Sequence, residues 1–236
     1  MGTLAFVCAM PMELKPLTKR LGLVKGEIGG VALRTGTLDG HPVVGFSTGM
    51  GTKLAAEHID RLLAAVHPER VVVFGITGAV EDQTPIGTVM MPALVIDHDT
   101  GRTHEHHPPG GELTKGTLWT TNIITPPSDL PGLVEQGVIA LDMETAAMAQ
   151  SCEREGVPWS VHRAISDHPS DDIDQEAFQV MNMDGTLNLG KAVRYFARHP
   201  IKSLGMAKLA KSGKLATENA ADAAIAAARA AQAEHP

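Results

Sequence analysis

The sequence has only two cysteines in 236 residues, Cys8 and Cys152, which lie in apolar surroundings far apart along the chain. There is no CxxC pair and no framework of regularly spaced cysteines, which excludes a disulfide-stabilised scaffold. This usage is typical of reduced thiols that fill the core of a cytoplasmic protein.

Long hydrophobic runs are also missing, because no stretch approaches the roughly 20 apolar residues of a membrane-spanning helix. The N-terminal segment has no basic region before its apolar residues and has an acidic residue soon after them, which argues against a secretory signal. Phe6 spoils a myristoylation motif. We therefore expect a cytoplasmic protein without a membrane partner.

Positive charge is scarce and scattered. The chain has 20 Lys and Arg against 27 Asp and Glu, with a formal net charge of −7. No basic patch of the kind that binds nucleic acid stands out, so a small molecule is the expected ligand. Hydrophobic residues make up 43% of the chain, which is enough for the core of one large domain.

Short apolar runs alternate with amphipathic segments, and this alternation predicts an α/β fold. TLAFVCA is the first predicted strand, followed by a helix with Leu14, Leu17 and Leu21 on one face that ends at Gly22. Further strands are predicted in VALRTGTL, HPVVGFSTG, RVVVFGI, IGTVMMPALVIDHD, TLWTTNII, GVIAL and VPWSVHRAIS, and further helices in TKLAAEHIDRLLAAV, METAAMAQSCERE and the residues after Asp174. We expect three layers, with helices on both sides of a mixed central β-sheet.

The alanine-rich C-terminus is set apart by its composition. We divide the chain into a catalytic domain at residues 1–199 and a helical extension at residues 200–236, with Thr217 as a plausible N-cap. Alanine favours helix but buries little apolar area, so a partly mobile helical tail without chemistry is the favoured interpretation. The alternative is a helix packed on its own or a neighbouring subunit.

Three carboxylates each follow a predicted strand: Glu13, Glu144 and Asp167. Ligands of open α/β sheets gather beyond the carboxyl ends of the strands, so these side chains are expected to line one cleft. Taken singly, Glu13 and Glu144 are equally explained as acids that offset a helix dipole, and Asp167 as a loop acid.

The segments around these acids resemble the nucleoside phosphorylase/nucleosidase superfamily, most closely its 5′-methylthioadenosine/S-adenosylhomocysteine nucleosidases, over about residues 3–198. The segments are, in order, AMPMELKPL, STGMGTKLAA, FGITGAVED, IGTVMMP, ALDMETAAMA and HRAISDHPSDD. The resemblance implies that Asp167 protonates the purine at N7, that Glu144 binds the ribose hydroxyls, and that Glu13 orients the attacking water. It also implies a homodimer and no cofactor.

The resemblance implies lesser roles for neighbouring residues. Met143 is expected to pack against the sugar and Ser166 to hold Asp167 by a hydrogen bond, while Arg163 is either a supporting charge or a structural ion pair. The remaining expected substrate-binding residues are Met50, Gly75, Thr77, Gly78, Ile123 and Ile124, the last two as the adenine wall.

Water is favoured over phosphate as the nucleophile. The first strand leads to Met10-Pro11-Met12-Glu13, with an anion and no arginine. Two like charges about 4 Å apart repel by about 4 kcal/mol at an effective dielectric near 20, which lowers phosphate affinity. Ile76 and Thr88 depart from the family pattern and suggest a different substrate. The alternatives are therefore a phosphorylase, an enzyme that cleaves adenine from lipid-linked adenosine as in hopanoid-linked members, and a non-catalytic nucleoside-binding protein.

A His-rich stretch, IDHDTGRTHEHHPPGG, collects potential metal ligands between Asp97 and His107. It has no HExxH spacing, and the expected chemistry needs no Lewis acid. We expect a polar hairpin or loop near the mouth of the cleft, with no metal site.

Overall fold

The computed structural model describes residues 2–111, 113–171 and 202–234, together with Asn182, Thr186, Asn188 and Lys191. The strands are β1 Leu4–Cys8, β2 Val24–Ile28, β3 Val31–Leu38, β4 His41–Ser47, β5 Arg70–Ala79, β6 Val89–Met90, β7 Leu94–Asp97, β8 Thr103–Glu105, β9 Thr117–Thr120, β10 Val138–Asp142 and β11 Trp159–Asp167. The helices are α1 Pro11–Leu21, α2 Thr52–Val66, α3 Leu130–Glu135, α4 Thr145–Arg154 and α7 Lys202–Glu234, with short 3-10 turns η1 Pro109–Gly111 and η2 Pro169–Asp171. The predicted α/β class is confirmed.

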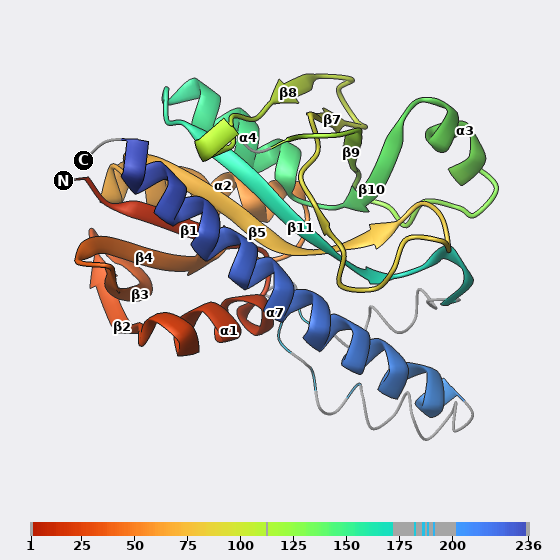
Figure 1. Ribbon diagram of the computed structural model, residues 1–236, viewed down its shortest axis with the longest axis horizontal. Helices are drawn as coiled ribbons and strands as arrows, with labels where there is room; N and C mark the ends of the chain where they lie inside the picture. The colour runs from red at the N-terminus through yellow and green to blue at the C-terminus, as the bar shows by residue number, and fades with distance from the viewer. Residues whose placement is uncertain are drawn as a thin grey trace.

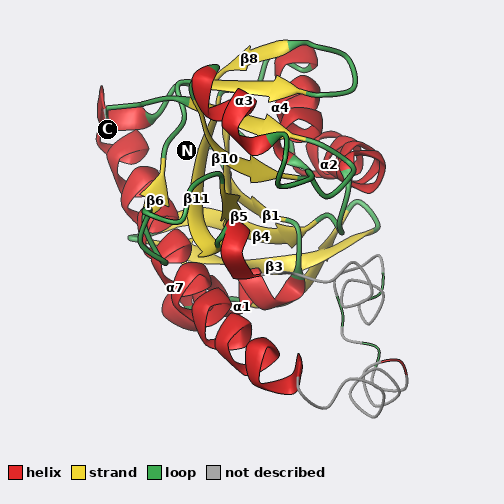
Figure 2. Ribbon diagram, turned by 90° about the vertical axis from the view of Figure 1, so that its right-hand side faces the viewer, coloured by secondary structure: helices red, strands yellow, loops and turns green. Residues whose placement is uncertain are grey.

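The strands form one mixed sheet with helices on both faces (Figures 1 and 2). Side chains alternate along the central strands. One face packs against α2 and α4 in a core that includes Val7, Val73, Ile59, Leu62, Met148 and Cys152. The other face packs against α1 and α7 in a core that includes Cys8, Phe6, Phe74, Leu17, Ala220 and Ala224. Both cysteines are fully buried, as predicted.

The strand β5 lies at the point where the sheet divides. Along one edge it pairs in parallel with β11 from Val71 to Gly78. Along the other edge, β1 pairs with residues 70–73, and β10 pairs with residues 78–79 in the antiparallel sense. Among the described strands, none covers residues 74–77 on that second edge. Crevices form where neighbouring strands diverge in this way.

The C-terminal extension is a docked helix, so the favoured interpretation of a partly mobile tail is wrong and the alternative of packing on its own subunit holds. Helix α7 crosses the face of the sheet over β5 and β11 (Figure 1). Six of its alanines are completely buried: Ala216, Ala220, Ala221, Ala224, Ala227 and Ala228. Alanine side chains are small enough to let the helix backbone lie close to the sheet, so a long contact compensates for the small area that each methyl group buries.

Thr217 is not an N-cap. Helix α7 begins at Lys202, and Thr217 lies inside it, where its hydroxyl donates to the Lys214 carbonyl at 2.9 Å. A threonine hydroxyl can bond to nearby backbone groups at an N-cap, but inside a helix it can also bond back to the preceding turn, as Thr217 does. The start of the alanine-rich run therefore does not mark the start of the helix.

Most predicted strands and helices before Asp167 are present, and two elements were missed. The strand β2 and the helix α3 escaped prediction, and β8 was covered only by the loop or hairpin expected of the His-rich stretch. The predicted helix after Asp174, with breaks near Asp184-Gly185 and Pro200, lies largely outside the described residues. None of the described helices is long and apolar enough to span a bilayer.

Candidate active site

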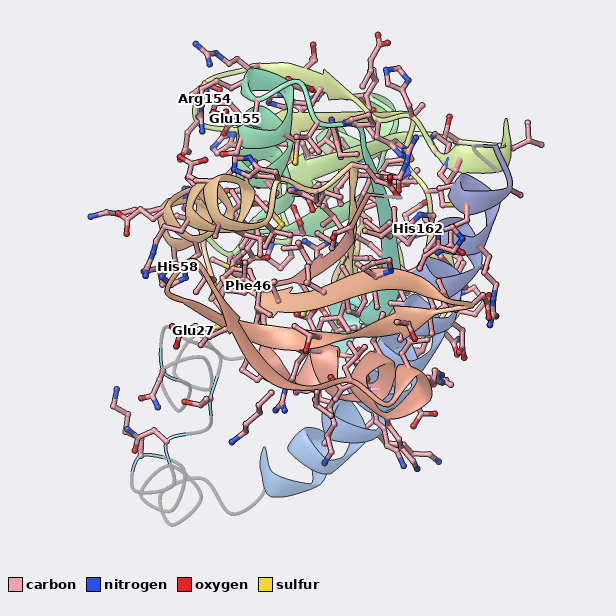
Figure 3. The ribbon with its side chains drawn as sticks, turned by 90° about the vertical axis from the view of Figure 1, so that its left-hand side faces the viewer. Glu27, Phe46, His58, Arg154, Glu155 and His162 are labelled. Atoms are coloured by element: carbon pink, nitrogen blue, oxygen red, sulfur yellow. The ribbon has the colours of Figure 1, made fainter. Side chains whose placement is uncertain are left out.

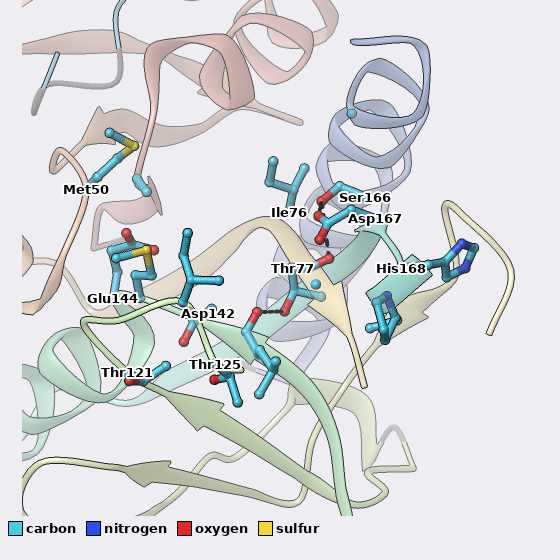
Figure 4. A pocket seen from close by; sticks show the side chains of 18 of the residues that line it. Met50, Ile76, Thr77, Thr121, Thr125, Asp142, Glu144, Ser166, Asp167 and His168 are labelled. Carbon is cyan, nitrogen blue, oxygen red and sulfur yellow. Dashed lines mark hydrogen bonds between the residues drawn. The ribbon is translucent and has the colours of Figure 1, made fainter. Parts of the chain in front are cut away.

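A cavity of about 660 Å³ opens at the divided edge of the sheet (Figure 4). Its size lies within the usual range of small-molecule sites. The polar lining residues are Glu13, Thr77, Thr121, Thr125, Asp142, Glu144, Ser166, Asp167 and His168. The apolar ones include Met10, Met12, Met50, Ile76, Ile123, Ile124, Leu130, Leu141, Met143 and Leu209. The three carboxylates singled out in the sequence therefore share one cavity.

Glu13 closes the uncovered edge of β5. Its Oε1 accepts a hydrogen bond from the Ile76 amide at 2.8 Å, and its Oε2 accepts one from the Met10 amide at 2.6 Å. The side chain is 1% exposed, so burial raises its pKa, while Arg163 and these amides act in the opposite direction. The Glu13 carboxylate accepts the hydrogen bond that a neighbouring strand would otherwise accept from the Ile76 amide. Backbone amides, rather than a side-chain donor, therefore fix its position.

Glu144 stands at the N-terminus of α4. Its Oε1 accepts a hydrogen bond from the Gly51 amide at 2.8 Å. Burial and the charge of Asp142 raise the pKa of Glu144 to about 8. The Glu144 carboxyl therefore favours its protonated form at neutral pH.

Arg163 lies behind these two carboxylates and is 1% exposed. Its Nη2 donates to Asp142 Oδ2 at 2.6 Å, and both its Nε and Nη2 donate to the Thr145 hydroxyl. Its guanidinium lies 3.9 Å from Glu13 Oε1 and 3.9 Å from Glu144 Oε2. Arg163 therefore has both of the roles considered for it. It forms a structural ion pair with Asp142, and it supplies a supporting charge for the two glutamates.

Asp167 ends β11, across the cavity from Glu144 (Figure 4). The Ser166 hydroxyl donates to Asp167 Oδ1 at 2.5 Å, in agreement with the role expected for Ser166. Burial raises the pKa of Asp167, the Ser166 hydrogen bond lowers it, and the nearby Asp171 carboxylate raises it. The net shift is upward, so this carboxyl keeps its proton to higher pH than an exposed aspartate.

The turn after Asp167 is tied to α7. Asp171 accepts a hydrogen bond from the His168 amide at 2.8 Å and pairs with Lys208 at 2.6 Å. Leu209 and Gly213 of the same helix line the cavity. The C-terminal helix therefore forms part of the site, although the sequence analysis predicted no chemical role for it.

The other predicted substrate-binding residues divide into two groups. Met50, Thr77, Gly78, Ile123, Ile124 and Met143 line the cavity. Gly75 is not among the lining residues, and its part in substrate binding stays a prediction. A Cβ on Gly75 would lie 2.3 Å from Glu13 Oε1 and 2.7 Å from Arg163 Nη1, so the missing side chain makes room for those two groups.

Several residues of the site escaped sequence reasoning, among them Asp142 and Thr121. Asp142 lies within the family segment, two positions before Glu144, and its carboxylate accepts hydrogen bonds from Thr120, Thr145 and Arg163. Thr121 lines the cavity next to the predicted base wall. The alternation of β10 places both Asp142 and Ala140 on its buried face, which was an available signal for Asp142.

The His-rich stretch forms the β7–β8 hairpin, as predicted. His104 pairs with Glu153 at 2.8 Å, and the ring of His106 packs against Trp159. At the turn, Asp97 accepts hydrogen bonds from Asp99 and Thr100. Among the described residues, no group of three or more His, Cys, Asp or Glu side chains is placed to hold a metal ion.

Comparisons with known proteins agree with the fold. A family model described as the phosphorylase superfamily matches residues 3–127 and 116–198. The 5′-methylthioadenosine/S-adenosylhomocysteine nucleosidase of Bacillus thuringiensis (strain Al Hakam) is 26% identical over 196 residues, which cover 70% of this chain and 85% of that protein.

Two solved structures share the fold. The 5′-methylthioadenosine/S-adenosylhomocysteine nucleosidase of S. pneumoniae, bound to a transition-state inhibitor, has a TM-score of 0.71 and 19% identity, covering 97% of this chain and 99% of that one. The futalosine hydrolase of Helicobacter pylori strain 26695 has a TM-score of 0.70 and 15% identity, covering 99% and 98%. These matches extend over α7, so the C-terminal helix has a counterpart in the fold.

Proposed function

The chain belongs to the phosphorylase superfamily, and on that premise we propose that it hydrolyses the N-glycosidic bond of an adenine nucleoside and releases the free base. The nucleoside is modified at its 5′ position, as in methylthioadenosine or S-adenosylhomocysteine, on which curated relatives act by name. The observation that carries the proposal is the arrangement of Glu13, Glu144 and Asp167 around one cavity.

Asp167 is the general acid. As the bond between the sugar and the base breaks, the electron pair moves onto the purine, and a proton from Asp167 to N7 makes the base a better leaving group. Positioned general acids contribute roughly 10²–10⁴-fold to rate. The upward pKa shift of Asp167 suits this role, because a donor must hold its proton at working pH.

Glu144 binds the ribose hydroxyls. In the ligand-free cavity its carboxyl is favoured in the protonated form. Hydroxyl donors that bond to the carboxylate favour the ionised form, and so does the positive charge that develops on the sugar. Substrate binding is therefore expected to draw the proton off Glu144, and the resulting anion stabilises the oxocarbenium-like transition state.

Glu13 orients the attacking water. Its oxygens are held by the Ile76 and Met10 amides, so the group is fixed before substrate arrives. The water adds to the anomeric carbon and gives up a proton to the Glu13 carboxylate as the new bond forms, which leaves the 5′-modified ribose as the second product. Both oxygens of Glu13 face partners that do not move with the substrate, which favours one water position.

Water remains favoured over phosphate, although a guanidinium does lie close to Glu13. Arg163 comes from β11, so it is not part of the segment after the first strand from which the absence of arginine was inferred. Its charge is shared with Asp142, Glu13 and Glu144, so one cation faces three acids. An entering phosphate would add further negative charge to this group, at an unfavourable Coulomb energy.

Ile76 and Thr88 do not argue for a non-catalytic protein. Ile76 positions Glu13 and Arg163 through its backbone, because its amide donates to Glu13 and its carbonyl accepts from Arg163 at 3.4 Å. A change of side chain leaves both hydrogen bonds intact. Thr88 is not among the residues that line the cavity.

A second candidate substrate is adenosine linked to a large apolar group. Exposed apolar residues surround part of the cavity: Met12 is 42%, Ile123 61% and Ile124 37% exposed. These side chains would remain exposed to solvent beside a small nucleoside, whereas an apolar 5′ substituent would cover them.

Release of free base from a nucleoside panel in phosphate-free buffer tests the proposal. We expect adenine and ribose-containing product without phosphate, and no increase in rate when phosphate is added. A strict requirement for phosphate would show a phosphorylase instead. Nucleoside binding by calorimetry with no product after long incubation would leave only the non-catalytic alternative.

The proposal includes a cytoplasmic homodimer. Met12, Ile123 and Ile124 are exposed apolar side chains at the cavity, and a second copy of the chain could cover them, which supports a dimer. Sedimentation equilibrium should give twice the chain mass, and cell fractionation should leave the protein in the cytosol. A monomer at working concentration would remove the dimer from the proposal.

A further inference from the structure

Three segments that are far apart in sequence meet at the side chain of Asn122. Its Oδ1 accepts a hydrogen bond from the Thr52 amide at 3.0 Å and lies 2.9 Å from the Thr52 hydroxyl. Its Nδ2 donates to Asp99 Oδ2 at 2.9 Å and to the Thr52 hydroxyl at 2.7 Å. One amide thus joins the N-terminus of α2, the turn of the β7–β8 hairpin, and the loop that follows β9.

The α2 side of this junction leads directly to Glu144. Thr52 follows Gly51, whose amide donates to Glu144 at 2.8 Å. Gly51 has a φ of 87°, a conformation that L side chains rarely adopt, so its N–H direction depends on how the turn is held. Asn122 holds the next residue of that turn.

The β9 side leads to the cavity wall. Asn122 lies between Thr121 and Ile123, which both line the cavity. Ile123 is 61% exposed, so packing does little to fix it. Its amide makes a long hydrogen bond of 3.3 Å to the Thr121 hydroxyl. The Asn122 side chain is therefore a main restraint on this loop.

We propose that Asn122 is a positioning residue that fixes the loop at Thr121 and Ile123 relative to Glu144 through Gly51. The turn of the His-rich hairpin supplies the third anchor at Asp99, which gives that segment a part in the site without any metal. The inference rests on the proposed function only for the identity of the ligand. A mere helix cap would affect stability and leave the Glu144 side of the cavity unchanged.

A reciprocal exchange tests the junction. Asn122→Asp keeps the acceptor for Thr52 but sets two carboxylates against each other at Asp99. Adding Asp99→Asn restores a donor and an acceptor at that contact. We expect Asn122→Asp to lower kcat/KM for the cleaved nucleoside by about tenfold or more, and the double variant to recover most of the loss.

Two comparisons separate positioning from general damage. Gln232→Ala removes a surface amide that bonds to the Leu38 carbonyl at the far end of α7, and it should leave the rate unchanged.

The Asn122 variants should remain folded because His58 also holds the turn before α2, with its Nδ1 2.5 Å from the Thr48 carbonyl and its ring against Phe46 (Figure 3). In a Glu144→Gln background, Asn122→Asp should weaken nucleoside binding, measured by calorimetry, much less than in the wild type, because its effect passes through Glu144.

Amide hydrogen exchange gives a readout that does not depend on catalysis. Asn122→Asp should speed exchange in peptides covering residues 48–54 and 120–125, and the double variant should slow it again. If the wild type releases no base, the proposed function fails while exchange still decides the inference. Unchanged exchange in both peptides, or a rate loss in Asn122→Asp that the second substitution leaves in place, would overturn the inference.

Discussion

At the scale of single residues, Gly75 shows how a missing side chain shapes the cavity. Its φ of 147° and the 2.3 Å approach that a Cβ would make to Glu13 leave no room for alanine. Gly75→Ala should displace Glu13 and lower base release about 100-fold, since misplacing a reacting group by about 1 Å has a cost of that order. Steady-state kinetics measures this loss.

Gly156→Ala is the matched control for Gly75→Ala. Gly156 also has a left-handed φ, of 67°, but nothing lies within 4 Å of the Cβ position. It should lower the melting temperature through backbone strain without changing kcat. Equal kinetic losses in the two variants would show that strain alone, rather than contact with Glu13, accounts for Gly75.

Glu144 gives a prediction about stability and pH. Its pKa is raised from 4.5 to about 8 by burial and Asp142, so between these pH values the folded state keeps a proton that the unfolded state has lost. The free energy of unfolding should therefore fall as pH rises through this window. Glu144→Gln has no such proton, so its stability relative to the wild type should be greater at pH 8 than at pH 5.

Thermal melts at pH 5 and pH 8 measure this difference. One unit of pKa shift corresponds to about 1.4 kcal/mol, so the change should be readily detected. Activity should be lost at both pH values, because glutamine is not an anion. A constant stability difference across the window would show that Glu144 is ionised in the folded protein.

The sequence predicted the reacting carboxylates but not what supports them. Glu13, Glu144 and Asp167 each follow a strand, and strand ends are visible in a hydrophobic pattern. The links from Arg163 to Asp142, Thr145 and Glu13 join β11 with β10, α4 and α1. Contacts between distant segments depend on the register of the folded sheet, which a single sequence does not reveal.

At the scale of elements, two substitutions of Gly213 in α7 should have different effects, one on stability and the other on substrate binding. It lines the cavity, and nothing lies within 4 Å of its Cβ position. Gly213→Ala should stabilise the protein by about 0.5–1 kcal/mol, because glycine is unfavourable inside a helix. Gly213→Phe should fill part of the cavity and raise KM most for nucleosides with large 5′ groups.

Denaturant unfolding and a substrate series check the two halves of this prediction. Gly132→Ala in α3 is a control, since its Cβ position is also open and it does not line the cavity. An equal rise in KM for small and large 5′ groups would place α7 away from the 5′ end of the substrate.

The elements that sequence analysis missed share a physical cause. The strand β2 has no fully buried residue, so it lacks the apolar alternation by which a strand is recognised. Helix α3 is only six residues long and contains Pro131 and Gly132. The alanines of α7 predicted helix correctly, but their burial depends on the shape of the sheet beneath them rather than on their hydrophobicity.

At the scale of the whole molecule, the divided sheet explains why the acids converge. Strand β1 leads to Glu13, β10 leads to Glu144, and β11 ends at Asp167, and all three strands pair with β5. The gap left between β1 and β10 on one edge of β5 receives Glu13, while Asp167 lies across the cavity. The α/β pattern was predictable from alternation, whereas this division follows from pairing partners.

The most direct test of the account compares adenine release by the wild type and by Asp167→Asn in phosphate-free buffer. Asparagine keeps the shape of the side chain but has no acidic proton to give to the base. We predict a loss of at least about 10²-fold in kcat with an unchanged fold by circular dichroism and retained nucleoside binding. A folded Asp167→Asn variant that releases adenine at the wild-type rate would contradict the account.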